Sequence, residues 1–197
     1  MRLILASASS TRAGLLRAAA VPFDILPARV DEDTIKARML TSGADARAVA
    51  DALAEVKAVR VSASNPGALV LGADQVLAFE SELVSKSADL PAAAALLRRL
   101  RGKPHSIITA TVLARDGAPI WRHLVAATLT MRDFSEEFLV DYIAQEAENL
   151  LASVGNFQIE GRGIQLFERI DGDYFAILGL PLIPLLTELR RQGIIAP

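Results

Sequence analysis

The sequence has no cysteine, which excludes a disulfide framework, a thiol nucleophile and a zinc–thiolate site. Its two histidines form neither a Ser-His-Asp arrangement nor a metal-binding cluster, and no Walker loop or dinucleotide fingerprint occurs. The net charge is only -2, so bulk electrostatics gives no reason to expect nucleic acid as a partner. No apolar run is long enough to cross a bilayer, and Ser7, Ser9 and Arg12 interrupt the start too early for a signal peptide. We therefore expect a cytoplasmic protein that binds neither nucleic acid nor membrane.

What is present is a hydrophobic chain, 52% apolar over 197 residues, which suffices for one globular domain with a sizeable core. Strands are expected at Leu3–Ala6, Phe23–Leu26, Val70–Phe79, Phe157–Ile159 and Ile164–Phe167, and in a hairpin around Asp116–Pro119. Helices are expected at Ser10–Ala20, Ala44–Ser62, Asp89–Leu100 and Glu136–Ala147, and between Pro181 and Gly193. No internal repeat or linker interrupts this alternation. The sequence predicts a single α/β or α+β domain over residues 1–197 with a mixed sheet.

The first polar motif is "LASASSTR", in which a strand leads into a loop and then into a helix. Ser7, Ser9 and Arg12 would offer two hydroxyls and a guanidinium to a phosphate oxygen at this junction. The alternative is that Ser9 or Ser10 only caps the helix and that Arg12 is solvated.

An acidic stretch follows at Asp31, Glu32 and Asp33, which we expect to form a loop. Clustered carboxylates suit magnesium or manganese, which prefer oxygen ligands and share them with substrate phosphates, although a solvated acidic loop is the plainer interpretation. Lys57 lies in an otherwise apolar helix and could reach a phosphate, or its ammonium could extend to solvent from a surface helix.

The stretch "VLGADQVLAF" places Asp74 and Gln75 inside an apolar strand. A buried carboxylate must be hydrogen-bonded, paired with a cation, bound to metal or set at a cleft, because an unpaired buried charge is too costly. Asp74 is therefore the strongest candidate for a general base or metal ligand. Lys86 follows at a distance from which a hairpin would fold back, and it either offsets the carboxylate, binds phosphate or stays a surface lysine.

The segment from Ser153 to Leu182 is rich in glycine, which indicates several tight turns. Glu160 is a second carboxylate that we expect in an apolar strand. We interpret His105 as structural.

Taken in order, these motifs resemble the Maf family of nucleotide pyrophosphatases, also called septum-formation inhibitor proteins. The resemblance covers the whole chain through "LILASASSTRAGLL", "VDE", "LAEVKA", "VLGADQV", "SKS", "RGKPHSIIT" and "GIQLFERIDGDYFAILGLPL". It implies a central, elongated mixed sheet flanked by helices, a cleft, and hydrolysis of a nucleoside triphosphate to the monophosphate and pyrophosphate. It also implies a divalent cation, magnesium or manganese, and a homodimer as the family-level expectation.

The same resemblance implies roles for individual residues. Asp74 matches the family's catalytic base, with Glu32 and Lys86 as further catalytic residues, and Glu32 and Asp74 would hold the metal. The candidate partners of the Asp74 charge are then this metal and the cations Lys57 and Lys86. Lys86 would also contact phosphate. The other substrate contacts would be made by Ser7, Ser9, Arg12, Lys57, Gln75 and Glu160.

Several positions depart from the common family pattern. Ser10 and Thr11 replace a proline and an arginine, Ser85-Lys86-Ser87 replaces Gly-Lys-Pro, and a family lysine is absent at Ser153. The pairs Asp74-Gln75 and Glu160-Gly161 are similar to the 7-methyl-GTP branch, whereas the branch acting on dTTP and UTP has threonine and glutamine there. The alternatives are a dTTP or UTP pyrophosphatase and a non-catalytic, nucleotide-responsive regulator of septum formation.

Overall fold

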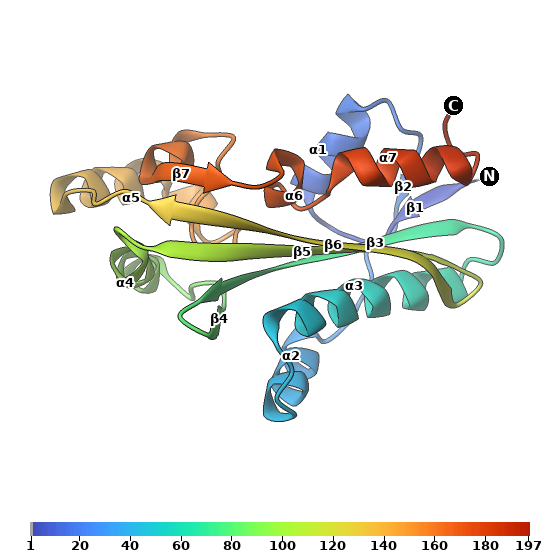
Figure 1. Ribbon diagram of the computed structural model, residues 1–197, viewed down its shortest axis with the longest axis horizontal. Helices are drawn as coiled ribbons and strands as arrows, with labels where there is room; N and C mark the ends of the chain where they lie inside the picture. Colours follow the sequence, from blue (N-terminus) through green and yellow to red (C-terminus); the bar gives the residue numbers. More distant parts are fainter. Residues whose placement is uncertain (1) are drawn as a thin grey trace. The chain divides into compact units, whose positions relative to one another are not determined.

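The computed structural model describes residues 2–197 (Figure 1). Within them, seven strands form one mixed sheet in the order β2-β1-β3-β5-β6-β7, with β4 paired to β3. The strands are β1 Leu3–Leu5, β2 Asp24–Ile25, β3 Leu69–Phe79, β4 Glu82–Val84, β5 Pro104–Arg115, β6 Ala118–Met131 and β7 Phe167–Asp171. β1 is parallel to β2 and β3, whereas the pairs β3–β4 and β6–β7 are antiparallel. The α/β prediction with a mixed sheet is confirmed.

Helices account for the remaining elements of the fold. They are α1 Ser10–Ala18, α2 Glu32–Thr41, α3 Ala46–Ala63, α4 Leu90–Leu100, α5 Glu136–Leu150, the 3-10 helix η1 Arg162–Leu166, α6 Tyr174–Ile177 and α7 Leu182–Arg191. Side chains cap several of them, because Asp45, Asp89 and Ser135 each accept a hydrogen bond from a backbone N–H of the first turn. None of the helices in residues 2–197 is both long and apolar enough to cross a membrane.

Three local predictions were wrong. The acidic stretch is not a loop, because Asp31 caps α2 and Glu32 begins it, where carboxylates favour the positive end of the helix dipole. The stretch Phe157–Ile159 forms no strand, and most of Ile164–Phe167 is η1. At Gly163 a side chain would collide with the backbone of Gln158, at 2.5 Å from its carbonyl oxygen, so the glycine lets the segment turn back on itself.

The chain divides into two compact units. The first comprises the chain up to Gln75, Ile108–Ala126 and Asp173–Pro197; the second comprises Val76–Ile107 and Ala127–Gly172. Strands β3, β5 and β6 contribute residues to both.

In the first unit, the two faces of β1 and β3 pack on different helices. One face packs with α1 and α7, in a cluster that includes Leu5, Leu16, Leu71, Leu113 and Leu185. The other face packs on α3, in a cluster that includes Ile4, Ala6, Val61 and Val70. α3 lies on the opposite side of these strands from α1 and α7 (Figure 1). Since strand side chains alternate between faces, Asp74 lies on the α3 face and Gln75 on the α1/α7 face.

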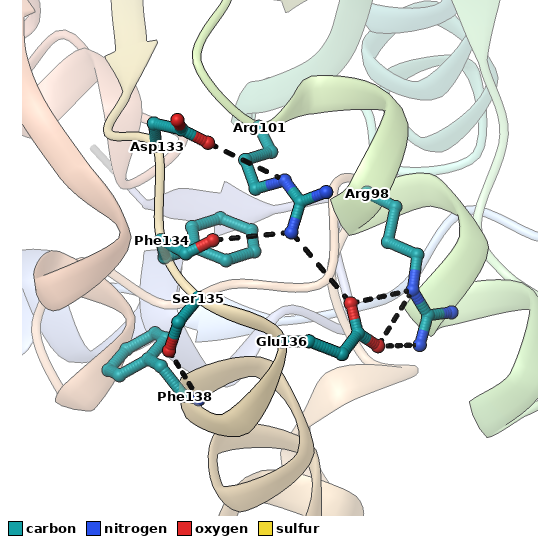
Figure 2. Close-up of polar contacts among 7 residues, drawn as sticks. All are labelled: Arg98, Arg101, Asp133, Phe134, Ser135, Glu136 and Phe138. Carbon is teal, nitrogen blue, oxygen red and sulfur yellow. Dashed lines mark hydrogen bonds and ion pairs between the residues drawn. The ribbon is translucent and has the colours of Figure 1, made fainter.

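In the second unit, α4 and the start of α5 are joined by a polar network (Figure 2). Arg98 Nε donates to both carboxylate oxygens of Glu136, at 2.9 and 3.2 Å. Arg101 Nη1 donates to the carbonyl of Phe134 at 3.2 Å, while its guanidinium lies over the Phe134 ring. The Arg98–Glu136 pair is exposed, so it contributes little stability by itself, and the buried ring of Phe134 anchors the junction.

His105 is buried against Phe157 and Phe167 in the second unit, with ring centroids 5.7 and 5.8 Å away. Burial lowers the pKa of His105 to about 4, and the backbone of Lys103 opposes this effect only in part. The side chain is thus neutral at pH 7 and packs as part of the core, which agrees with the structural interpretation.

Candidate active site

The centre of the candidate site is Lys57, which bridges two carboxylates. Its Nζ lies 2.6 Å from Asp74 Oδ1 and 2.8 Å from Glu32 Oε1. Lys57 and Asp74 are buried, with 7% and 5% of their surface exposed. The interpretation of Lys57 as a lysine extending to solvent was therefore wrong. The pairing removes the cost that burial would otherwise place on Asp74.

Gly72 explains how Lys57 reaches Asp74. A Cβ at residue 72 would lie 2.3 Å from the carbonyl oxygen of Ala54 and 2.7 Å from the backbone nitrogen of Ala58. No side chain fits there, so the α3 backbone packs directly on β3. Asp74 follows Gly72 by two positions, so its side chain lies on the same face of β3, the face that packs on α3. The small residues of "LGAD" therefore bring the lysine to the aspartate.

Glu32 enters the site from the first turn of α2. Asp31 holds that turn by accepting hydrogen bonds from the backbone N–H and the hydroxyl of Thr34, at 3.1 and 2.8 Å. Partial burial works against ionisation of Glu32, but the hydrogen bond from Lys57 and the charges of Lys57, Lys36 and Arg12 outweigh it, so the pKa of Glu32 is lowered. Glu32 is a carboxylate at neutral pH.

Asp74 has one carboxylate oxygen to spare. Oδ1 accepts from Lys57, but Oδ2 is buried and has no hydrogen-bond partner among residues 2–197. A desolvated carboxylate oxygen without a partner is costly, so it marks a place where a proton, a water molecule or a cation would be bound.

Arg12 is held near these carboxylates by contacts at two of its nitrogens. Nε donates to the carbonyl of Gly179 at 3.0 Å, and Nη1 donates to Ser7 Oγ at 3.1 Å. Burial lowers the pKa of Arg12, while the negative charges of Asp74 and Glu32 act in the opposite direction, so the guanidinium remains charged. Two of the three guanidinium nitrogens are thus engaged, and contact of Arg12 with a substrate stays a prediction.

The serines of the first motif organise this corner. Ser9 caps α1 by accepting from the backbone N–H of Arg12 at 3.3 Å, as the capping alternative expected. Ser7 Oγ accepts from the backbone N–H of Ser9 at 3.2 Å as well as from Arg12. Contact of either hydroxyl with a substrate stays a prediction.

Gln75 points to the other face of β3 and is engaged there. Its Nε2 donates to Thr109 Oγ1 at 2.9 Å and to the carbonyls of Ala176 and Ile177 at 3.1 and 3.0 Å. The amide nitrogen is thus directed at protein acceptors, and contact of Gln75 with a substrate stays a prediction.

Lys86 belongs to the second unit, where it is exposed in the loop between β4 and α4. The β3–β4 hairpin that precedes it is confirmed, with Leu77 opposite Val84. Its neighbour Ser87 donates to Asn156 Oδ1 at 2.7 Å, and Asn156 is fully buried with a left-handed φ of 60°. Asn156 therefore fixes the loop that carries Lys86.

Glu160 also lies in the second unit, but not in a strand. It is exposed in a turn that precedes η1, which corrects the expectation of an apolar strand. The structure brings Glu32, Lys57, Asp74, Arg12 and Ser7 together within the first unit. The convergence of Lys86 and Glu160 with that cluster stays a prediction.

Sequence reasoning missed two residues that shape the site. Gly179 has φ +101° and presents its carbonyl to Arg12 from 167 positions away. Thr109 is a buried polar residue in the apolar run of β5. That interruption is the same kind of signal as the one at Asp74, but it is weaker because a threonine hydroxyl costs less to bury than a carboxylate.

A divalent cation is compatible with the oxygens present. Among residues 2–197 no group of three or more His, Cys, Asp or Glu side chains surrounds a common point. Magnesium and manganese, however, are commonly held by one or two carboxylates together with substrate phosphates and water. Asp74 Oδ2 is buried near Glu32 and has no partner within residues 2–197, which is the donor chemistry such an ion needs.

Comparison with known proteins places this geometry in a family. A 7-methyl-GTP pyrophosphatase of Brucella abortus is 48% identical over 192 residues, covering 98% of this chain and 96% of the relative. A nucleoside triphosphate pyrophosphatase of Granulibacter bethesdensis is 49% identical over 192 residues, covering 98% of each. A solved dITP/XTP pyrophosphatase from Mycobacterium abscessus aligns over 98% of this chain and 96% of its own at 13% identity; its TM-score of 0.44 carries no argument. The family profile described as "Maf-like protein" matches residues 2–192, and the chain belongs to that family.

Proposed function

We propose that this chain is an enzyme that hydrolyses nucleoside triphosphates to the monophosphate and pyrophosphate. The observation that carries the proposal is the buried, unpartnered Oδ2 of Asp74 beside the Lys57 ammonium. The names of the Brucella and Granulibacter relatives support the same reaction.

The chain's own residues supply both the base and the positive charge. Asp74 Oδ2 accepts a proton from a water molecule as the water oxygen bonds to the α-phosphorus, and the bond to the departing pyrophosphate breaks. Lys57 holds the carboxylate in place through Oδ1, which leaves Oδ2 directed away from it. Arg12 meets the phosphate oxygens with Nη2, where it offsets the charge that develops during attack.

A divalent metal belongs to this proposal. Glu32, Asp74, Lys57 and Arg12 together carry no net charge, so they do not neutralise a triphosphate. Glu32 and Asp74 would hold magnesium or manganese, which when bound would supply positive charge that polarises the phosphoryl oxygens. Lys86 and the hydroxyls of Ser7 and Ser9 complete the proposed phosphate contacts.

For the base, we propose 7-methyl-GTP as the preferred substrate. Guanine presents two adjacent N–H donors, which the Glu160 carboxylate would accept together, and methylation at N7 adds positive charge that a carboxylate also favours. The name of the Brucella relative agrees with this choice. dTTP or UTP is the alternative substrate, and a non-catalytic septum-formation regulator is the alternative function.

We further propose that the chain forms a single domain, lies in the cytoplasm and assembles as a homodimer.

A substrate panel tests the reaction. The protein is incubated with 7-methyl-GTP, GTP, dTTP, UTP and ATP, each with magnesium or manganese, and pyrophosphate and orthophosphate are measured separately. We expect metal-dependent pyrophosphate release, fastest with 7-methyl-GTP. Orthophosphate in place of pyrophosphate would refute the proposed bond cleavage, and no release from any nucleotide would favour the regulator.

Glu160→Gln tests the choice of base. We expect kcat/KM for 7-methyl-GTP to fall about 10-fold more than kcat/KM for UTP, because an amide cannot accept from both guanine donors. Glu168→Gln, the same exchange at another exposed glutamate of this unit, is the control. Equal losses for the two nucleotides would remove Glu160 from base recognition.

A further inference from the structure

The end of α6 is tied to the sheet by two side chains, those of Thr109 and Gln75. Thr109 Oγ1 donates to the carbonyl of Ala176 at 2.8 Å and accepts from Gln75 Nε2 at 2.9 Å. Gln75 reaches the carbonyls of Ala176 and Ile177 as well. The last carbonyls of a helix lack partners within the helix, so these donors fix where α6 ends.

The turn that follows leads directly to Arg12. The backbone N–H of Gly179 donates to Ala176 at 2.8 Å, which closes the turn on the same carbonyl that Thr109 holds. Gly179 then presents its own carbonyl to Arg12 Nε at 3.0 Å. Its φ of +101° lies in the left-handed region, and a Cβ there would lie 3.0 Å from Arg12 Nε, so only glycine fits without strain.

We propose that Thr109 is a positioning residue for Arg12. Its hydroxyl, together with the Gln75 amide, fixes the turn from Ala176 to Gly179, and the Gly179 carbonyl in turn fixes the guanidinium. Every link lies within the first unit. Neither Thr109 nor Gly179 needs to touch substrate for this role.

Holding the Arg12 guanidinium in place before a ligand binds lowers the entropic cost of binding. Arginine has a long, flexible side chain, and ordering it at the moment of binding costs conformational entropy. Gly179 and Ser7 hold Nε and Nη1 of the guanidinium in advance, so less of its freedom remains to be lost when a ligand binds. Preorganised donors act on developing charge without reorganisation during the reaction. A displaced turn would therefore weaken phosphate binding without removing any charge.

A double-mutant cycle tests the inference, which rests on the proposed function. Thr109→Val keeps the shape but removes the hydroxyl, and we expect kcat/KM for the best nucleotide to fall about 10-fold. Thr109→Ser, which restores a hydroxyl, should recover most of the loss. In an Arg12→Ala background, Thr109→Val should cause no further loss, because the group it positions is gone.

A matched control comes from the same strand. Thr111 is also fully buried in β5, but its hydroxyl has no hydrogen-bond partner among residues 2–197. Thr111→Val should leave kcat/KM unchanged. If Thr109→Val does not fold, Gly179→Ala displaces the same contact and should show the same dependence on Arg12.

The outcomes distinguish the positioning role of Thr109 from the proposed phosphate contact of Arg12. The positioning role is overturned if Arg12→Ala is harmful while Thr109→Val is harmless, or if Thr109→Val costs as much without Arg12 as with it. Harmless Arg12→Ala would instead reject the proposed phosphate contact, and with it any functional need to position Arg12.

Discussion

Replacing Asp74 with asparagine is expected to lower kcat/KM for the preferred nucleotide about 1,000-fold, within the range that a general base contributes. The exchange keeps the shape of the side chain but removes the basicity of the unpartnered Oδ2. Lys57 keeps Glu32 as an ionic partner, so the fold should persist. Steady-state rates of pyrophosphate release measure the effect, with thermal unfolding as the check on folding.

Asp133→Asn is the matched control for this experiment. The Asp133 side chain is 91% exposed, and its ion pair with Arg101 is long, at 3.7 Å. The same chemical change there should leave the rate as it was. Retention of more than about a tenth of the activity by Asp74→Asn would rule out Asp74 as the base.

Lys57→Met is expected to produce the largest loss of stability, about 3–5 kcal/mol, because it leaves the buried Asp74 carboxylate without its cation. Methionine matches much of the apolar length of lysine, so lost packing contributes little. Urea unfolding of the variant and of the wild type measures the loss.

The companion experiment combines Lys57→Met with Asp74→Asn. Removing the stranded charge should restore a substantial part of the stability lost in Lys57→Met. If the double variant is as unstable as the single one, loss of packing rather than loss of charge destabilises the protein. Activity should be lost in both variants, since neither retains the ion pair.

The central residue of the site, Asp74, was predicted from the free-energy cost of burying a charge. Asp74 sits in a run of apolar residues, and burial of its charge required a partner. Lys57 was named as a candidate partner, and the contact exists. The alternation of Asp74 and Gln75 between two faces is likewise a local property of a strand, so the sequence suffices to place them on opposite sides.

The rest depended on contacts between distant segments. Nothing near Arg12 indicates that the carbonyl of Gly179 will hold it, because that contact joins residues 167 positions apart. The resemblance gave Gln75 as a substrate contact, whereas its amide nitrogen donates to the carbonyls of α6, which are 101 and 102 positions away. The error at Ile164–Phe167 has another cause, since a short apolar run fits a strand and a 3-10 helix equally well.

The absence of a side chain at Gly72 sets the distance between α3 and β3 across which the Lys57–Asp74 ion pair forms. Direct contact between the backbone of α3 and that of β3 sets a gap that the four-carbon stem of Lys57 spans. An arginine at that position would carry the same charge but a longer, planar head group, and it would not fit the same gap. The side-chain sizes at positions 57, 72 and 74 thus depend on one another. A change in the size of any one of them requires a matching change in another if the pair is to survive.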